Sequence, residues 1–158
     1  MGNKKILIIC ISTHHGNTIK IAKVISDILS AKVVKPTDVD IKNVFDYDLI
    51  GFGSGIYFGN YHKSLLDVIN KSPILKDKKV FIFSTSGMKQ GGLFNNFNKA
   101  LKDKLLKKGF DVIGEFNCLG FDTAGPLKAI GGLNKNRPNE KDLKKAQDFA
   151  REINNKIN

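Results

Sequence analysis

The segment from Ser12 to Thr18 is the part of the sequence best suited to chemistry. It reads Ser12-Thr13-His14-His15-Gly16-Asn17-Thr18 and lies between an apolar run and an amphipathic stretch. Its hydroxyls, its amide and the free N–H groups of a helix start would suit an anion, which the helix dipole also favours. It lacks the lysine of a nucleoside-triphosphate loop and the glycine pattern of a dinucleotide fold. The segment therefore predicts a site for one phosphate group, with simple helix capping as the alternative.

A second segment, Gly53–Asn60, combines aromatic residues with glycines. Tyr57 and Phe58 offer rings on which a flat aromatic ligand could stack. Gly55 and Gly59 allow the backbone to approach such a ligand closely. The alternative is that the two aromatic side chains pack beneath their own loop.

A third segment, Ser84–Gly92, consists mainly of small hydroxylated residues and glycines. Thr85, Ser86 and Gly87 come first in it, where the backbone can lie against the polar edge of a ligand. A flexible connector is the alternative, and it suits the part beyond Met88 better than the part before it.

A long stretch without a regular pattern runs from Gly120 to Pro138. Loops of this length in compact domains are usually functional or disordered. Phe121 and Asp122 stand near its start, where they can line a ligand pocket. Its basic residues form a candidate docking surface, and they are Lys128, Lys135 and Arg137.

The elements that must position these segments alternate along the chain. Apolar runs predict strands at Lys5–Ile11, Ala31–Lys35, Leu49–Ser54, Val80–Ser84 and Val112–Leu119. Amphipathic stretches predict helices at Asn17–Leu29, Tyr61–Asn70, Phe94–Lys108 and from about Asn139 to Asn155. Apolar strands separated by helices predict an α/β fold with a five-stranded parallel sheet in the order 2-1-3-4-5. Ligands of such sheets bind beyond the carboxyl ends of the strands, where the four segments above would meet.

The loop ending Gly16-Asn17-Thr18 resembles the phosphate loop of the flavodoxin family. Three further segments are similar to those of clostridial and archaeal-type single-domain members: Ser54-Gly55-Ile56-Tyr57-Phe58-Gly59, Gly120-Phe121-Asp122-Thr123 and Gly131–Asn139. The likeness covers essentially the whole chain. It implies a flavodoxin-like three-layer sandwich, a single domain over residues 1–158, FMN as cofactor and one-electron transfer as the activity.

The loops and this resemblance together give one set of expected FMN contacts. Its members are Ser12, Thr13, His14, Gly16, Asn17, Thr18, Ser54, Gly55, Ile56, Tyr57, Phe58, Gly59, Thr85, Ser86, Gly87, Gly120, Phe121 and Asp122. We expect no catalytic acid, base or nucleophile and no metal site.

The net charge of +11 is unusual beside the typically acidic flavodoxins. The lysines are dispersed, so we expect neither nucleic acid nor membrane as partner, but redox proteins with acidic docking surfaces. The apolar runs are too short to span a bilayer, which favours a cytoplasmic protein, and a monomer is the expected state. Cys10 and Cys118 fall on strands three places apart, roughly 14 Å, too far for a disulfide.

Two other functions remain open on the sequence. The first is a small FMN-dependent oxidoreductase, of the quinone or flavin reductase or protoporphyrinogen-oxidase type. The short chain shows no added nicotinamide-binding region, which counts against the NAD(P)H-dependent version. The second is a basic binding module that keeps the fold without flavin. A two-component receiver domain is excluded because the acidic pair after the first strand is missing.

Overall fold

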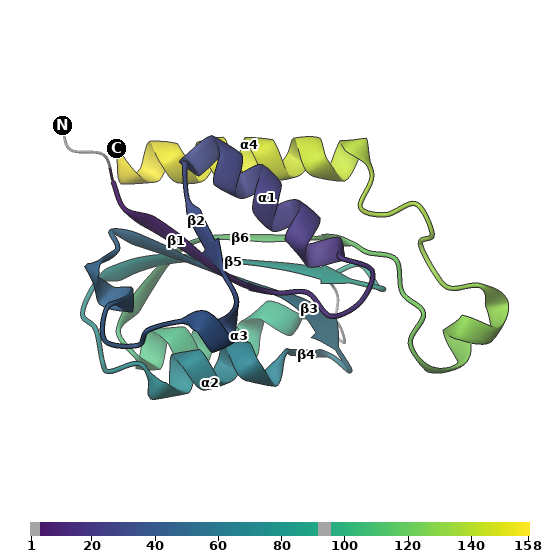
Figure 1. The fold of residues 1–158 in the computed structure, drawn as a ribbon, viewed down its shortest axis with the longest axis horizontal. Coiled ribbons are helices and arrows are strands. Elements are labelled where there is room, and N and C mark those ends of the chain that lie inside the picture. The colour runs from purple at the N-terminus through teal and green to yellow at the C-terminus, as the bar shows by residue number, and fades with distance from the viewer. Residues whose placement is uncertain (1–3, 92–95) are drawn as a thin grey trace.

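The structure, a computed structural model, describes residues 4–91 and 96–158 and contains a central parallel sheet (Figure 1). Its strands are β1 (Ile6–Ile11), β2 (Lys32–Val34), β3 (Leu49–Tyr57), β5 (Lys78–Ser86) and β6 (Phe110–Leu119), and they lie in the order β2-β1-β3-β5-β6. Counted along the chain, this is the predicted order 2-1-3-4-5. The short strand β4 (Asn60–Tyr61) was not predicted, and it pairs antiparallel with the end of β3.

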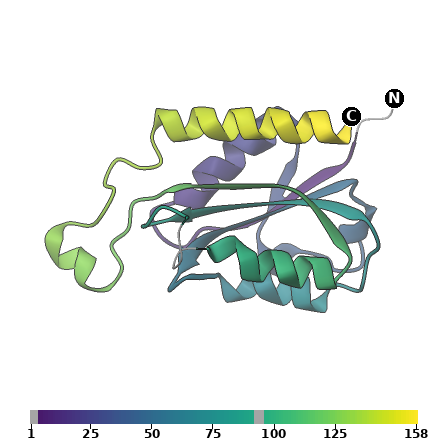
Figure 2. The same cartoon turned by 180° about the vertical axis from the view of Figure 1, so that it is seen from behind.

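Helices cover both faces of the sheet and make three layers, as Figures 1 and 2 show. On one face lie α1 (Asn17–Leu29) and α4 (Glu140–Ile157), and on the other lie α2 (Lys63–Lys71) and α3 (Phe97–Lys107). Each face has its own apolar core. Ile8 and Phe83 belong to the core beneath α1 and α4, whereas Ile9 and Ile82 belong to the core beneath α2 and α3. Alternate residues of one strand thus pack into the cores on opposite faces of the sheet. Both sets must be apolar, which explains the near-continuous apolar runs.

Two glycines of β3 make room for aromatic rings of the neighbouring strand. Gly51 and Gly53 pair with Phe81 and Phe83 of β5, and a Cβ atom on either glycine would overlap the facing ring. Glycine at these two positions therefore leaves room for the phenylalanine rings in the core, although glycine is a weak strand former.

The segment after β3 differs from the sequence prediction. β3 runs on to Tyr57, so Gly55 and Ile56 lie in a strand rather than in a loop. Phe58 and Gly59 have positive φ angles of 50° and 78° and form the tight turn that leads into β4. The helix predicted to start at Tyr61 begins only at Lys63, because Tyr61 is paired in this hairpin.

The long stretch after β6 is more regular than predicted. It contains the 3-10 helix η3 (Gly125–Ile130), and Asp122 pairs with Leu133 in an isolated β-bridge. β6 itself begins at Phe110, two residues before the predicted start. The predicted start of the third helix at Phe94, and Gly92 of the third segment, lie outside the described residues.

In residues 4–91 and 96–158, no helix is long and apolar enough to cross a membrane. Both cysteines are free thiols, as predicted, and both are buried. Burial raises the pKa of Cys10 and of Cys118 to about 12, because the thiolate would lose its hydration.

A raised pKa keeps both thiols protonated over the whole physiological range, and the thiolate is the reactive form. We predict that the folded protein shows no fast reaction with Ellman's reagent at about pH 8, whereas protein unfolded in guanidinium reacts at both thiols. Rapid modification of either cysteine in the native state would contradict the buried positions.

Candidate functional site

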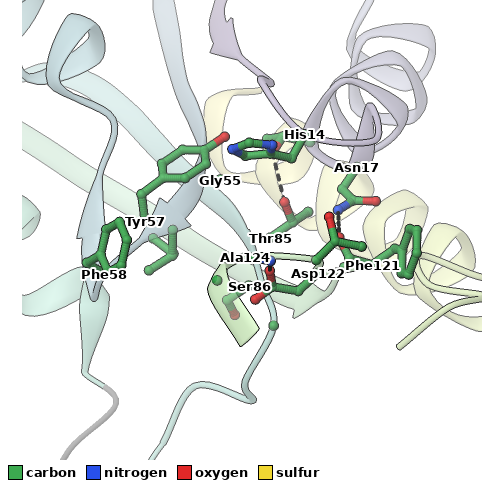
Figure 3. Close-up of a pocket in the computed structure, with 16 residues that line it drawn as sticks. His14, Asn17, Gly55, Tyr57, Phe58, Thr85, Ser86, Phe121, Asp122 and Ala124 are labelled. Carbon is green, nitrogen blue, oxygen red and sulfur yellow. Dashed lines mark hydrogen bonds between the residues drawn. The ribbon is translucent and has the colours of Figure 1, made fainter. Parts of the chain in front are cut away.

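A cavity of about 490 Å³ opens at the carboxyl edge of the sheet, between the loops that follow β1, β3, β5 and β6 (Figure 3). Its lining residues come from all four loops or from the strand ends beside them. They are His14, Asn17, Thr18, Gly55, Ile56, Tyr57, Phe58, Thr85, Ser86, Gly87, Gly120, Phe121, Asp122, Thr123, Ala124 and Gly125. Its volume is in the usual range for small-molecule sites, about 300–1,000 Å³.

The amino end of α1 forms one end of this cavity. Gly16 is the residue before the helix, with φ of 66°, and glycine has no side chain that could cap the helix. By contrast, Asn139 and Asp142 form a complete capping box at the start of α4. The first N–H groups of α1 thus keep the positive field that attracts anions.

Hydroxyl groups surround this helix end. Thr18 and Thr85 are buried, and their hydroxyls lie 2.8 Å apart. The hydroxyl of Ser12 is also buried but makes no hydrogen bond within the described part of the chain. A buried donor without a partner is rare in native proteins, so Ser12 has a hydrogen bond to offer.

The Tyr57 side chain turns back toward the first loop instead of standing at the tip of its own (Figure 3). Its hydroxyl lies 2.5 Å from the Thr13 hydroxyl and accepts a 3.3 Å hydrogen bond from the Thr13 N–H. Its ring centroid is 5.6 Å from that of His14. Tyr57 therefore lines the cavity and also contacts the first loop, Ser12–Thr18, through its hydroxyl.

Phe58 behaves differently from its neighbour. Its side chain is 98% exposed at the hairpin turn and points away from Tyr57 in Figure 3. Of the two proposed stacking residues, Tyr57 lies within the cavity and Phe58 lies at its mouth.

The loops after β1 and β6 are tied together directly. The Asn17 side-chain amide donates a 2.8 Å hydrogen bond to the Phe121 carbonyl. His15 contacts Thr123 through a 2.8 Å hydrogen bond, and its ring lies 4.2 Å from the Phe121 ring. The two loops therefore hold each other in place.

A second tie joins the loops after β5 and β6. The Asn134 side-chain amide donates to the Gly87 carbonyl at 2.7 Å and to the Gly120 carbonyl at 3.3 Å. A Cβ atom on Gly87 would overlap the Asp122 carboxylate, which accepts a hydrogen bond from the Ala124 N–H. Glycine is thus needed at this wall for a packing reason.

The return of the long loop to α4 is fixed by an ion pair. The Nε and Nη2 donors of Arg137 both contact the buried carboxylate of Asp142. This hydrogen-bonded partner raises the pKa of Arg137 further, so its charge is permanent. Arg137 therefore belongs to the scaffold, although the sequence placed it in a docking surface.

Most of the residues predicted as FMN contacts line this one cavity. The exceptions are Ser12, Thr13, Gly16, Ser54 and Gly59. Ser12, Thr13 and Gly16 stand in the first loop beside the cavity. Ser54 faces the hairpin, where its hydroxyl accepts from the His62 N–H at 3.0 Å.

Sequence reasoning missed Thr123, Ala124 and Gly125 as lining residues. Thr123 belongs to the segment Gly120-Phe121-Asp122-Thr123, whose resemblance to flavodoxin-family proteins could have identified it as a lining residue. The position of Ala124 and Gly125 depends on the β-bridge between Asp122 and Leu133. No local sequence pattern predicts this bridge.

Fold and site together define a doubly wound α/β protein with a cavity at the carboxyl edge of its sheet. Residues 8–119 match the model of a family described as a flavodoxin domain. An uncharacterised protein of Methanocaldococcus jannaschii is 52% identical over 149 residues, which cover 94% of this chain and 97% of that protein. The chain belongs to the flavodoxin family.

Solved structures agree with this fold. A flavodoxin from the domain Archaea has a TM-score of 0.70 at 18% identity, covering 97% of this chain and 98% of its own. Oxidised flavodoxin 1 from Bacillus cereus has a TM-score of 0.71 at 19% identity, covering 96% and 97%. At this level of identity the likeness concerns the fold.

The tie through Asn17 can be tested by replacement. Asn17→Ala leaves the Phe121 carbonyl without its donor, so we expect a loss of about 1–3 kcal/mol in the free energy of unfolding, measured in urea. Asn155→Ala is the matched control, because Asn155 is exposed and makes no side-chain hydrogen bond among the described residues. Equal stability of both variants would show that the tie contributes nothing.

Proposed function

We propose that this protein binds FMN in the cavity and serves as an electron carrier. The observation that carries the proposal is the pairing, in one cavity, of an uncapped helix end among hydroxyls with an aromatic wall. The bound flavin would supply the redox chemistry, while the protein binds and orients it and limits its exposure to water.

The residues present suit a phosphate monoester at the α1 end. Phosphate oxygens accept hydrogen bonds, and the loop offers N–H groups and the unpartnered hydroxyl of Ser12. The sequence of this loop has no lysine, so the donors are neutral and the helix dipole supplies the favourable field.

The other end of the cavity suits the flavin ring. Tyr57 offers an aromatic ring to the cavity, and Gly55, Gly87, Gly120 and Phe121 form other parts of its wall. A carrier is favoured over an oxidoreductase by the family match. NAD(P)H oxidation in the presence of quinones is the assay that separates the two, and we expect none above the rate of free FMN.

Ser12→Ala tests the phosphate end most cleanly. The hydroxyl makes no hydrogen bond in the described structure, so its removal leaves no protein group unsatisfied and should change stability little. Hydrogen bonds to charged groups contribute about 1.5–3 kcal/mol, so we expect FMN to bind about 10- to 150-fold more weakly. Quenching of FMN fluorescence gives the affinity.

Riboflavin, which lacks the phosphate, is the control ligand. Its affinity should be far below that of FMN and should be the same for wild type and Ser12→Ala. If the replacement weakened both ligands equally, Ser12 would act on the ring or on the fold, and the phosphate assignment would be wrong. A protein that quenches neither ligand would refute FMN binding.

Tyr57→Phe tests whether the Tyr57 hydroxyl and the phosphate compete for the Thr13 N–H. The Tyr57 hydroxyl takes the Thr13 N–H, a donor that a phosphate would also use. The phenylalanine keeps the aromatic face but releases that donor, so we expect FMN to bind about 2- to 10-fold more tightly and riboflavin to be unaffected. A parallel loss for both ligands would mean that the hydroxyl supports the ring site instead.

A further inference from the structure

Exposed apolar side chains lie on the loops that border the cavity. Phe58, at the β3–β4 turn, is 98% exposed, and Met88, after β5, is 56% exposed. Ile130, at the end of η3, is 75% exposed. The cavity lies between these loops, since Phe58 and Gly125 both line it. In Figures 1 and 2 the η3 segment projects beyond the sheet edge, beside the carboxyl ends of the strands.

The charges at this mouth are almost entirely positive. The loop segments 12–16, 58–62, 87–91 and 120–139 contain a single acidic residue, Asp122. That carboxylate packs against Gly87 and accepts from the Ala124 N–H, within the cavity wall.

Two lysines carry the outward positive charge of the long loop. Lys128 and Lys135 are exposed, and neither makes an ion pair within the described part of the chain. Arg137 is instead neutralised by the buried Asp142. The mouth thus combines apolar residues with free lysines, and this is the pattern of a transient docking site for a protein of opposite charge.

We propose that this mouth surface, made of Phe58, Met88, Lys128, Ile130 and Lys135, docks an electron-transfer protein whose own docking face is acidic around an apolar centre. The proposal rests on the proposed function, because a partner must come close to the bound flavin to exchange electrons with it. The lysines steer and orient the partner, and the apolar side chains supply the contact that excludes water.

The experiment must separate the effect of the two mouth lysines from that of the net charge, because a chain of net charge +11 attracts any acidic protein to some extent. The FMN-loaded protein is titrated with a purified acidic [2Fe–2S] ferredoxin, and the dissociation constant is measured at physiological ionic strength. The test variant is Lys128→Glu with Lys135→Glu. The control is Lys4→Glu with Lys76→Glu, which changes the net charge equally.

Lys4 and Lys76 precede β1 and β5 and are exposed at the opposite edge of the sheet. Charges farther away than the Debye length of about 8 Å are largely screened, so we expect less than about a twofold change for the control pair. Reversal of both mouth lysines turns attraction into repulsion, and we expect about 5- to 50-fold weaker binding. Phe58→Ser should weaken binding without changing its salt dependence.

The docking proposal would be overturned if the two double variants lost ferredoxin affinity equally, if the mouth variant lost none, or if basic cytochrome c bound equally tightly. An oligonucleotide that binds at the mouth more tightly than the ferredoxin would also overturn it. FMN binding is followed separately by fluorescence quenching. A chain that does not bind FMN refutes the proposed function, whereas an FMN-loaded chain that ignores the acidic probe refutes only the docking proposal.

Discussion

The amino end of α1 lacks a side-chain cap, and the proposed phosphate site depends on this one feature. Gly16 takes a left-handed conformation that brings the chain from β1 into the helix, and it leaves the first N–H groups without a side-chain acceptor. Groups of this kind are satisfied by backbone carbonyls, by water or by a ligand, and the Asn17 N–H donates to the His14 carbonyl at 3.5 Å. The start of α4, by contrast, is closed by the capping box of Asn139 and Asp142.

The surrounding loops keep this helix end accessible and hold its neighbours in fixed positions. Asn17 connects the first loop to the Phe121 carbonyl, and Asn134 connects the long loop to Gly87 and Gly120. Amide side chains are well suited to this task because they carry two donors and no charge. A cavity bounded by such ties is preorganised, so little binding energy is lost in ordering it.

The order of the parallel strands followed from the sequence because it depends on local apolar runs and on general rules of α/β topology. The position of the first loop beside the cavity also followed, since its residues are contiguous and directly follow the first strand. The β3–β4 hairpin did not: it depends on the positive φ of Phe58, which a bulky residue rarely adopts. The fold of the long loop was missed because its bonds join residues far apart in the chain, such as Asn134 and Gly87.

The direction of Tyr57 could not be predicted for the same reason. Its aromatic type indicated a stacking residue, but its hydroxyl contacts Thr13, 44 residues earlier in the chain. Long-range polar contacts of this kind determine how a cavity is shaped. They are also the contacts on which affinity and selectivity for a ligand depend.

The position of the phosphate is the central claim, and ³¹P NMR of the FMN complex tests it most directly. A free phosphate monoester titrates with a second pKa near 6. Donors of the Ser12–Thr18 loop favour the charged form, so the bound resonance should stay unchanged between about pH 5 and pH 8. A bound resonance that follows the titration of the free ester would place the phosphate in solvent and contradict the account.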